Sequence, residues 1–213
     1  MKRIVFLAFS LVLLSVAVIG RFAGPVEVGG TIYIRPNGSV SPSTAKITTV
    51  DNVTYTFTDD NPHSIIVQRD NIMIDGAGYT LRGRQDWNSK GIDLTGRRNV
   101  TITNMKIREF FFGVWLEMSS GNSISGNDIT ENKVGIWLSE SSDNIVSGNG
   151  VTANVDYNIY LKHSSNNAIS GNSIAAEGRV WEANLHYSFF GIYLYHSPSN
   201  SISENNITNN GCG

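Results

Sequence analysis

The sequence repeats itself from about residue 71 onward, and this repeat limits the possible folds more than any other feature. One short motif combines a leading small residue with apolar and aromatic residues. Its copies are Gly91-Ile-Asp-Leu94, Gly113-Val-Trp-Leu116, Gly135-Ile-Trp-Leu138, Asn158-Ile-Tyr-Leu161 and Gly191-Ile-Tyr-Leu194. Successive copies start about 22 residues apart, except that the last gap is about ten residues longer. A period of this length is typical of a solenoid, in which each repeat stacks on the next.

A second motif falls between copies of the first. It reads Ser123-Ile-Ser-Gly-Asn-Asp-Ile129, Ile145-Val-Ser-Gly-Asn-Gly-Val151, Ala168-Ile-Ser-Gly-Asn-Ser-Ile174 and Ser201-Ile-Ser-Glu-Asn-Asn-Ile207, with a looser copy over Thr101–Ile107. Each unit therefore alternates short apolar strands with turns rich in Gly, Asn and Ser, and none has the spacing of an amphipathic helix. We predict an all-β fold, a right-handed single-stranded parallel β-helix of about 22 residues per coil.

Stacked coils would align equivalent residues in rows along the axis. In one coil, we expect Ile124, Ile129, Ile136 and Leu138 to point into the core. A second row contains the asparagine of each second motif, at a sharp bend where Gly and Asn tolerate left-handed backbone angles. Its members are Asn127, Asn149, Asn172 and Asn205. We predict that their amides hydrogen-bond in a structural ladder and do not hold a ligand.

The two ends of the repeat region differ. Residues 25–70 contain strand-like runs at Thr31–Ile34, Val53–Phe57 and Ser64–Val67, and we predict an N-terminal cap with a first irregular coil. Residues 71–213 would form the repeats. After Ile207 no further motif copy follows, so we expect an incomplete last coil. The chain is then either a fragment of a longer solenoid, which we favour, or its open edge is covered by a partner.

The first 24 residues have the features of a secretory signal peptide. Lys2 and Arg3 precede an apolar run from Ile4 to Ile19, and small residues recur from Gly20 to Gly24. The run is shorter than the roughly 20 residues needed to span a bilayer, which disfavours the alternative of an uncleaved anchor. We expect an exported protein that is extracellular, surface-attached or periplasmic and touches the membrane only through this segment.

Composition excludes several classes of partner and chemistry. The chain has 16 basic and 18 acidic residues and a net charge of −2, so it lacks the basic field that nucleic acid binding requires. Its single cysteine, Cys212, permits neither an intrachain disulfide nor a thiolate metal cluster. We expect no cofactor. Four sequons, at Asn37, Asn52, Asn99 and Asn206, would allow a glycoprotein in a host that modifies them.

The repeats resemble a known family. The Gly-Ile-Tyr-Leu and Asn-x-Ile-Ser-Gly-Asn motifs, with the stretch Asp70–Leu81, are similar to those of NosD-type parallel β-helix proteins. That family belongs to the wider group of carbohydrate-binding and sugar-hydrolase (CASH) β-helix domains with the pectin-lyase-like fold. The stretch Gly30–Ser39 also resembles openings of archaeal surface proteins. The resemblance implies the fold, but not one activity, because the group includes enzymes, binding proteins and copper-site maturation factors.

One candidate binding surface is a row of outward-facing aromatic residues. Strand alternation places Trp115, Trp137, Tyr160 and Tyr193 in one external column, with Asp93 in its first position. Exposed rings on a rigid sheet can bind the apolar faces of sugars, so binding of polysaccharide or cell-envelope glycans is the leading functional hypothesis. The alternative is that neighbouring rings stack on one another and only stiffen the solenoid.

Two sets of charged side chains suggest enzymatic alternatives. Asp93 and Glu117 face outward on adjacent coils at a separation of roughly 8 Å, within the range of an inverting glycosidase pair. Arg82, Arg84 and Lys90, near Trp87, could serve a lyase that needs a base and a clamp for an acid group. The enzymatic alternative is therefore a polysaccharide lyase, epimerase or hydrolase. Both sets are also ordinary surface charges, so we favour a binding protein over an enzyme. A protruding loop over residues 175–190 could wall a groove or pack on the coil below.

The third alternative is copper binding. The residues two positions beyond each core leucine are Met118, Glu140, His163 and His196, which places the two histidines on neighbouring coils. Such a pair could hold copper or zinc, and the NosD-type resemblance favours copper. Two histidines without a third strong ligand are otherwise ordinary turn residues, and we do not assign a metal site from the sequence.

Overall fold

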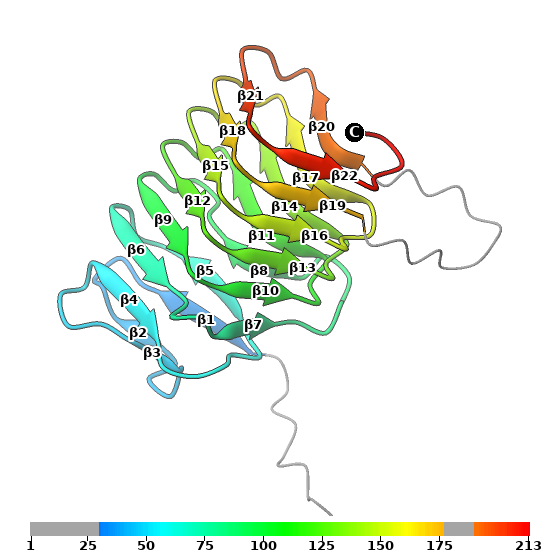
Figure 1. The fold of residues 1–213 in the computed structure, drawn as a ribbon. Coiled ribbons are helices and arrows are strands. Elements are labelled where there is room, and N and C mark those ends of the chain that lie inside the picture. The colour runs from blue at the N-terminus through cyan, green and yellow to red at the C-terminus, as the bar shows by residue number, and fades with distance from the viewer. Residues whose placement is uncertain (1–29, 177–189) are drawn as a thin grey trace, which may run out of the picture.

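The chain folds into a parallel β-helix (Figure 1). The structure is a computed structural model that describes residues 30–176 and 190–213. The predicted signal peptide and most of the predicted 175–190 loop lie outside these ranges. Within them the chain forms strands and turns, and no helix long and apolar enough to cross a membrane is present in this part of the protein.

Three sheets, here called A, B and C, form the walls of the solenoid in the described ranges. Sheet A contains β2 (Val40–Ser41), β1 (Thr31–Ile34), β5 (Ser64–Val67), β8 (Lys90–Asp93), β11 (Phe112–Glu117), β14 (Val134–Ser139), β17 (Tyr157–Lys162) and β20 (Phe190–Tyr195). Sheet B contains β3 (Ile47–Thr48), β4 (Thr54–Phe57), β6 (Ile72–Asp75), β9 (Val100–Thr103), β12 (Ser123–Ser125), β15 (Ile145–Ser147), β18 (Ala168–Ser170) and β21 (Ser201–Ser203). Sheet C contains β7 (Thr80–Arg82), β10 (Lys106–Arg108), β13 (Asp128–Thr130), β16 (Gly150–Thr152), β19 (Ser173–Ala175) and β22 (Asn206–Thr208).

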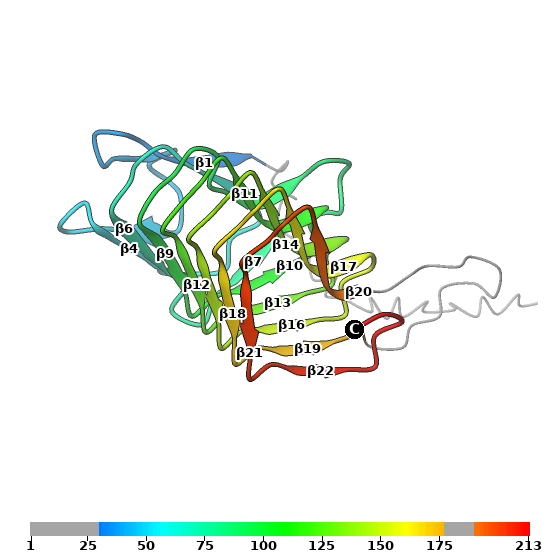
Figure 2. The same ribbon diagram turned by 90° about the horizontal axis from the view of Figure 1, so that it is seen from above.

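Each repeat visits the sheets in the order B, C, A before the chain climbs to the next coil (Figure 2). β9, β10 and β11 form one coil, and each of these strands pairs in parallel with its equivalent in the coil of β12, β13 and β14. Trp115 lies beside Trp137, and Ile107 beside Ile129. The predicted alignment of equivalent residues is therefore confirmed.

Inward-facing aliphatic residues form the core. Each repeat strand of sheets B and C contributes one such residue and each repeat strand of sheet A contributes two, so equivalent residues line up in rows along the axis. Ile124, Ile129, Ile136 and Leu138, the inward residues predicted for one coil, are all fully buried. The rows continue through Ile102, Val146 and Ile169 in sheet B, and through Ile107, Val151 and Ile174 in sheet C. A single coil could not bury these side chains, because each needs the coil above and below to exclude water.

The first strands depart from the parallel pattern. β2 pairs antiparallel with β1, and β3 pairs antiparallel with β4. Tyr55 and Phe57 from β4 are buried beneath this end, and the Tyr55 hydroxyl donates to the Gly38 carbonyl at 2.8 Å. These short antiparallel strands flank the lowest parallel strands of sheets A and B, where a solenoid would otherwise expose an open edge.

Buried asparagine ladders hold the corners of the coils. The predicted ladder exists: the Asn127 backbone N–H and side-chain amide both donate to Asn149 Oδ1, at 3.0 and 3.1 Å. Asn149 bonds Asn172 in the same way, and Asn172 bonds Asn205. At this corner only the residue before each asparagine has a positive φ, which is 65° at Gly126. The asparagines themselves turn inward and are buried.

Two more asparagine ladders and a serine row lie at other turns. One ladder consists of Asn122, Asn144, Asn167 and Asn200, and the other of Asn132, Asn154, Asn158 and Asn210. The serine row contains Ser119, Ser141, Ser164 and Ser197, in which each hydroxyl oxygen accepts from the backbone N–H of the serine below. These ladders explain Asn158, which replaces the motif glycine: its side chain bridges Asn154 and Asn210.

β20, β21 and β22 are the last strands of sheets A, B and C in the described ranges, and they contain inward residues that are partly exposed. Leu194, Ile202 and Ile207 are 38%, 44% and 36% exposed, whereas their equivalents one coil below are fully buried. Beyond β22 the Cys212 carbonyl accepts a hydrogen bond from the Gly191 N–H at 2.9 Å, on the sheet A side. The preference for a fragment over a partner-covered edge stays a prediction.

Candidate functional site

The outer face of sheet A contains a continuous column of aromatic rings. Trp115, Trp137, Tyr160 and Tyr193 occupy equivalent positions on β11, β14, β17 and β20. Their ring centroids are 5.4, 4.2 and 5.2 Å apart in that order, and neighbouring planes are within 19° of parallel. All four side chains are half-buried. The residues predicted as one external column therefore form one, as a stack.

Stacking changes what this column offers to a ligand. The two faces of Trp137 are occupied by Trp115 and Tyr160, so the inner rings turn their edges to the solvent. A sugar stacks on a ring face, and those faces are already in use. The arrangement matches the alternative in which the rings stiffen the solenoid. Polysaccharide binding by the column stays a prediction.

A second aromatic row, which sequence reasoning missed, supports the column from the side. Phe112, Tyr157 and Phe190 each precede the motif's first residue, and their rings contact the column rings edge-on at centroid distances of 4.5 to 4.9 Å. The indole N–H groups of Trp115 and Trp137 are buried and have no hydrogen-bond acceptor. The signal was visible in the sequence, because the residue before each motif copy is apolar or aromatic in four of the five.

Lys90 lies beneath the column. Its ammonium Nζ lies 4.4 Å from the centroid of the Trp115 ring and bonds Asp93 Oδ2 at 2.8 Å. Asp93 also accepts from the Thr95 N–H and hydroxyl at 2.9 and 2.6 Å. The carboxylate is thus held by a cation and by a turn, which is a structural arrangement. Lys90 is thus engaged by Asp93 and Trp115, and a role as a clamp for acidic sugars stays a prediction.

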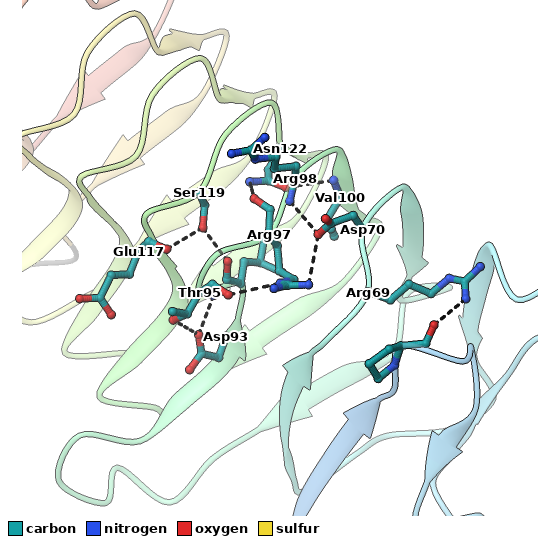
Figure 3. Close-up of polar contacts among 12 residues, drawn as sticks. Arg69, Asp70, Asp93, Thr95, Arg97, Arg98, Val100, Glu117, Ser119 and Asn122 are labelled. Carbon is teal, nitrogen blue, oxygen red and sulfur yellow. Dashed lines mark hydrogen bonds and ion pairs between the residues drawn. The ribbon is translucent and has the colours of Figure 1, made fainter.

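The proposed carboxylate pair lies on adjacent coils, but the described contacts do not make it a catalytic site. Asp93 pairs in register with Trp115, and Glu117 with Ser139, so the two acids are offset along the strands as predicted. Figure 3 shows Asp93 bonded to Thr95 and the Glu117 carboxylate extending outward without a contact to any residue drawn. Arg82 is bound by Glu109 through two hydrogen bonds. Catalysis by these residues stays untested.

The two histidines predicted to be neighbours do stack. The His163 and His196 ring centroids are 5.3 Å apart and their planes are within 6° of parallel. Both side chains are exposed, and the Tyr195 ring packs edge-on against both, at 5.6 and 4.3 Å. Each histidine has a positive φ, as do Met118 and Glu140 at the equivalent turn of the coils below. One turn column therefore carries a thioether, a carboxylate and two imidazoles.

This turn column offers only a few ligands to a metal ion. Among the described residues, no group of three or more His, Cys, Asp or Glu side chains could hold a metal ion. His63, the other described histidine, lies far away in the fold, where its Nδ1 accepts from the Gly30 N–H at 2.9 Å. The chain thus offers two adjacent imidazoles on an open surface, which suits a weak or transferable ion and not a closed structural centre.

Stacked coils with buried polar ladders define a parallel β-helix repeat protein. A family model described as "Periplasmic copper-binding protein (NosD)" matches residues 51–213. The chain belongs to this family, and the resemblance seen in its repeats is confirmed. The family's periplasmic location also agrees with the export expected from residues 1–24. Searches of curated proteins and of solved structures give no match.

Proposed function

We propose that this chain is an exported β-helix protein that binds a copper ion between His163 and His196. The observation that carries the proposal is the adjacency of two exposed imidazoles on neighbouring coils, with ring centroids 5.3 Å apart. At this distance, rotation about the side-chain bonds can turn one nitrogen of each ring toward a shared ion. Imidazole nitrogen is a good ligand for copper, and the family's own description names copper. The third hypothesis from the sequence is thereby preferred over a glycan-binding column.

The β-helix positions the pair rigidly. Ser164 and Ser197 follow the two histidines, and the Ser164 backbone N–H donates to Ser197 Oγ at 3.1 Å. The His163 backbone N–H donates to the Tyr195 carbonyl at 2.9 Å. These bonds hold both turns in register, so the imidazoles stay close together and only the exposed side chains have to reorient when they share an ion.

The turns also leave the site accessible. Neither imidazole is buried, so an ion can arrive from solvent or leave to another protein without opening the fold. Bound copper would supply a transferable metal centre. Glu140 and Met118 extend the column downward with an oxygen and a sulfur, ligands that favour different copper oxidation states.

Competition for Cu(I) against a coloured chelator tests the proposal. Chain that begins at residue 25 should withdraw copper from the chelator, and His163→Ala or His196→Ala should weaken the affinity at least tenfold, because each removes one of two ligands. His63→Ala is the matched control and should leave the affinity unchanged. X-ray absorption of the loaded protein should show nitrogen neighbours.

Two results would refute the site. One is a parent protein that leaves all copper on the chelator. The other is copper binding that survives both histidine substitutions, which would place the ion elsewhere on the chain.

A further inference from the structure

One tryptophan in the described ranges keeps its ring open to solvent. Trp87 lies on the turn between β7 and β8 and is 85% exposed, whereas Trp115 and Trp137 are half-buried in the column. Its ring meets only one described aromatic neighbour, Phe111, edge-on at 4.9 Å and 70°. Single exposed apolar side chains are common on folded domains, so the case for a binding surface rests on what surrounds this ring.

The turn that carries Trp87 is held firmly in place. The Gly83 and Gln85 N–H groups donate to the carbonyls of Arg108 and Glu109, at 2.9 and 2.7 Å. At the other end, Ser89 accepts from the next strand twice: its carbonyl from the Phe112 N–H at 2.8 Å and its hydroxyl from the Phe111 N–H at 3.0 Å. The exposed ring is therefore presented on a fixed loop, which limits the entropy lost when a ligand binds.

Beside Trp87 lies a surface depression of about 320 Å³. Its lining mixes aromatic and polar side chains, namely Gln85, Trp87, Phe110, Phe111, Lys133 and Val155. Lys133 Nζ lies 5.6 Å from the Phe111 ring centroid and bonds Asp156 at 2.9 Å. The lining thus supplies an apolar wall, the Lys133 ammonium, which pairs with Asp156, and the Gln85 amide.

We propose that the Trp87 depression is a binding site for a neutral pyranose unit of a polysaccharide. A sugar ring has an apolar face that packs on indole and peripheral hydroxyls that both donate and accept hydrogen bonds. The Trp87 ring face meets the first need, and the Gln85 amide and the Lys133 ammonium meet the second. Because Lys133 is neutralised by Asp156, the site favours an uncharged sugar over a uronate. This site is separate from the histidine pair and does not depend on copper.

The Trp87 depression differs from the aromatic column in the ring surface that it offers to a ligand. In the column, adjacent rings cover each other's faces, while Trp87 has no stacked partner among the described residues. The exported repeat protein would then contact glycans at the side of the solenoid, next to the sheet A face, and not along its stacked rings.

Titration of labelled protein with oligosaccharides, followed by the indole N–H signals in NMR spectra, tests the site. Cellohexaose and the hexamer of N-acetylglucosamine are the neutral probes, and an oligogalacturonate is the acidic one. We expect a neutral probe to shift the Trp87 indole signal, assigned through Trp87→Phe, and to leave those of Trp115 and Trp137 in place. Trp87→Ala should weaken binding about tenfold or more, because it removes the stacking surface.

Control variants separate this site from the column and from general surface effects. Trp115→Phe and Val50→Ala, the latter at a position that is 98% exposed, should both bind like the parent. The proposal is overturned if no neutral probe moves the Trp87 signal, if Trp87→Ala binds as tightly as the parent, or if the oligogalacturonate alone binds. None of these outcomes affects the copper test, since the two sites share no residue.

Discussion

Asn149 accepts two hydrogen bonds from Asn127 on the neighbouring coil, one from its backbone N–H at 3.0 Å and one from its side-chain amide at 3.1 Å. Its own side-chain amide donates in turn to Asn172 on the next coil at 3.0 Å. Both neighbours are at most 3% exposed. Buried polar groups are thus satisfied only because the ladder is continuous.

Removing one member of this ladder should therefore destabilise the protein. We expect Asn149→Ala to lower the free energy of unfolding by about 2–4 kcal/mol, because it leaves the Asn127 N–H and the Ile124 carbonyl without their partners. Urea denaturation measures the change. Asn206→Ala, at an exposed position on β22, is the control and should cost less than about 0.5 kcal/mol. Equal effects at the two sites would contradict the structural role of the ladder.

The aromatic column should contribute to stability. Trp137 is stacked on both faces, so Trp137→Ala should lower the free energy of unfolding by about 2–4 kcal/mol. Trp87→Ala removes the same side chain from an exposed turn and should change stability by less than about 0.5 kcal/mol. Thermal and urea unfolding of the two variants give the comparison. If Trp137→Ala left the free energy of unfolding unchanged, the stack would not contribute to stability.

Gly91, Gly113 and Gly135, which open three of the five motif copies, are constrained by the coil above. A Cβ on Gly113 would lie 2.6 Å from the Gly135 carbonyl oxygen, so Gly113→Ala should disrupt the stacking and cost more than about 2 kcal/mol. The matched control is Gly150→Ala on β16, where the nearest atom lies 3.7 Å away and φ is not positive. That change should be neutral or slightly stabilising, because it restricts the unfolded chain. Expression level and melting temperature of both variants check the contrast.

Two phenols on sheet A predict how stability responds to alkaline pH. Burial is the main cause that raises the pKa of Tyr157 and Tyr160 above the ordinary value of 10.0, and neighbouring phenols add to it. In the unfolded chain these groups lose their protons first, so the unfolded state binds fewer protons above that value. Stability is therefore complete below about pH 10 and falls as the pH rises further.

Urea denaturation from about pH 8 to about pH 11 measures this response, and phenolate absorbance follows the titration. The Tyr157→Phe/Tyr160→Phe variant should lose less stability over the same range. A parent protein whose stability rises above about pH 10 would contradict the sign of the effect.

Much of the architecture follows from the sequence because a solenoid is built from local repeats. The spacing of the Gly-x-x-Leu motif predicts which strands lie side by side, and strand alternation predicts that Val114 and Leu116 are buried while Trp115 faces outward. The same register correctly predicts that Asn127 aligns with Asn149 and that His163 lies beside His196. In each case residues that are one repeat apart in the sequence lie side by side on neighbouring coils.

Tertiary structure decided the properties that depend on side-chain orientation around those rows. Only coordinates reveal that the rings of Trp115 and Trp137 lie flat on each other, that Lys90 covers the end of their stack, and that Trp87 keeps an open face. Sequence periodicity places a residue on a row but carries no information on its rotamer or its partners from non-repeating turns. The sequence alone therefore determined the solenoid and its registers, while packing between coils determined which surfaces remain free to bind.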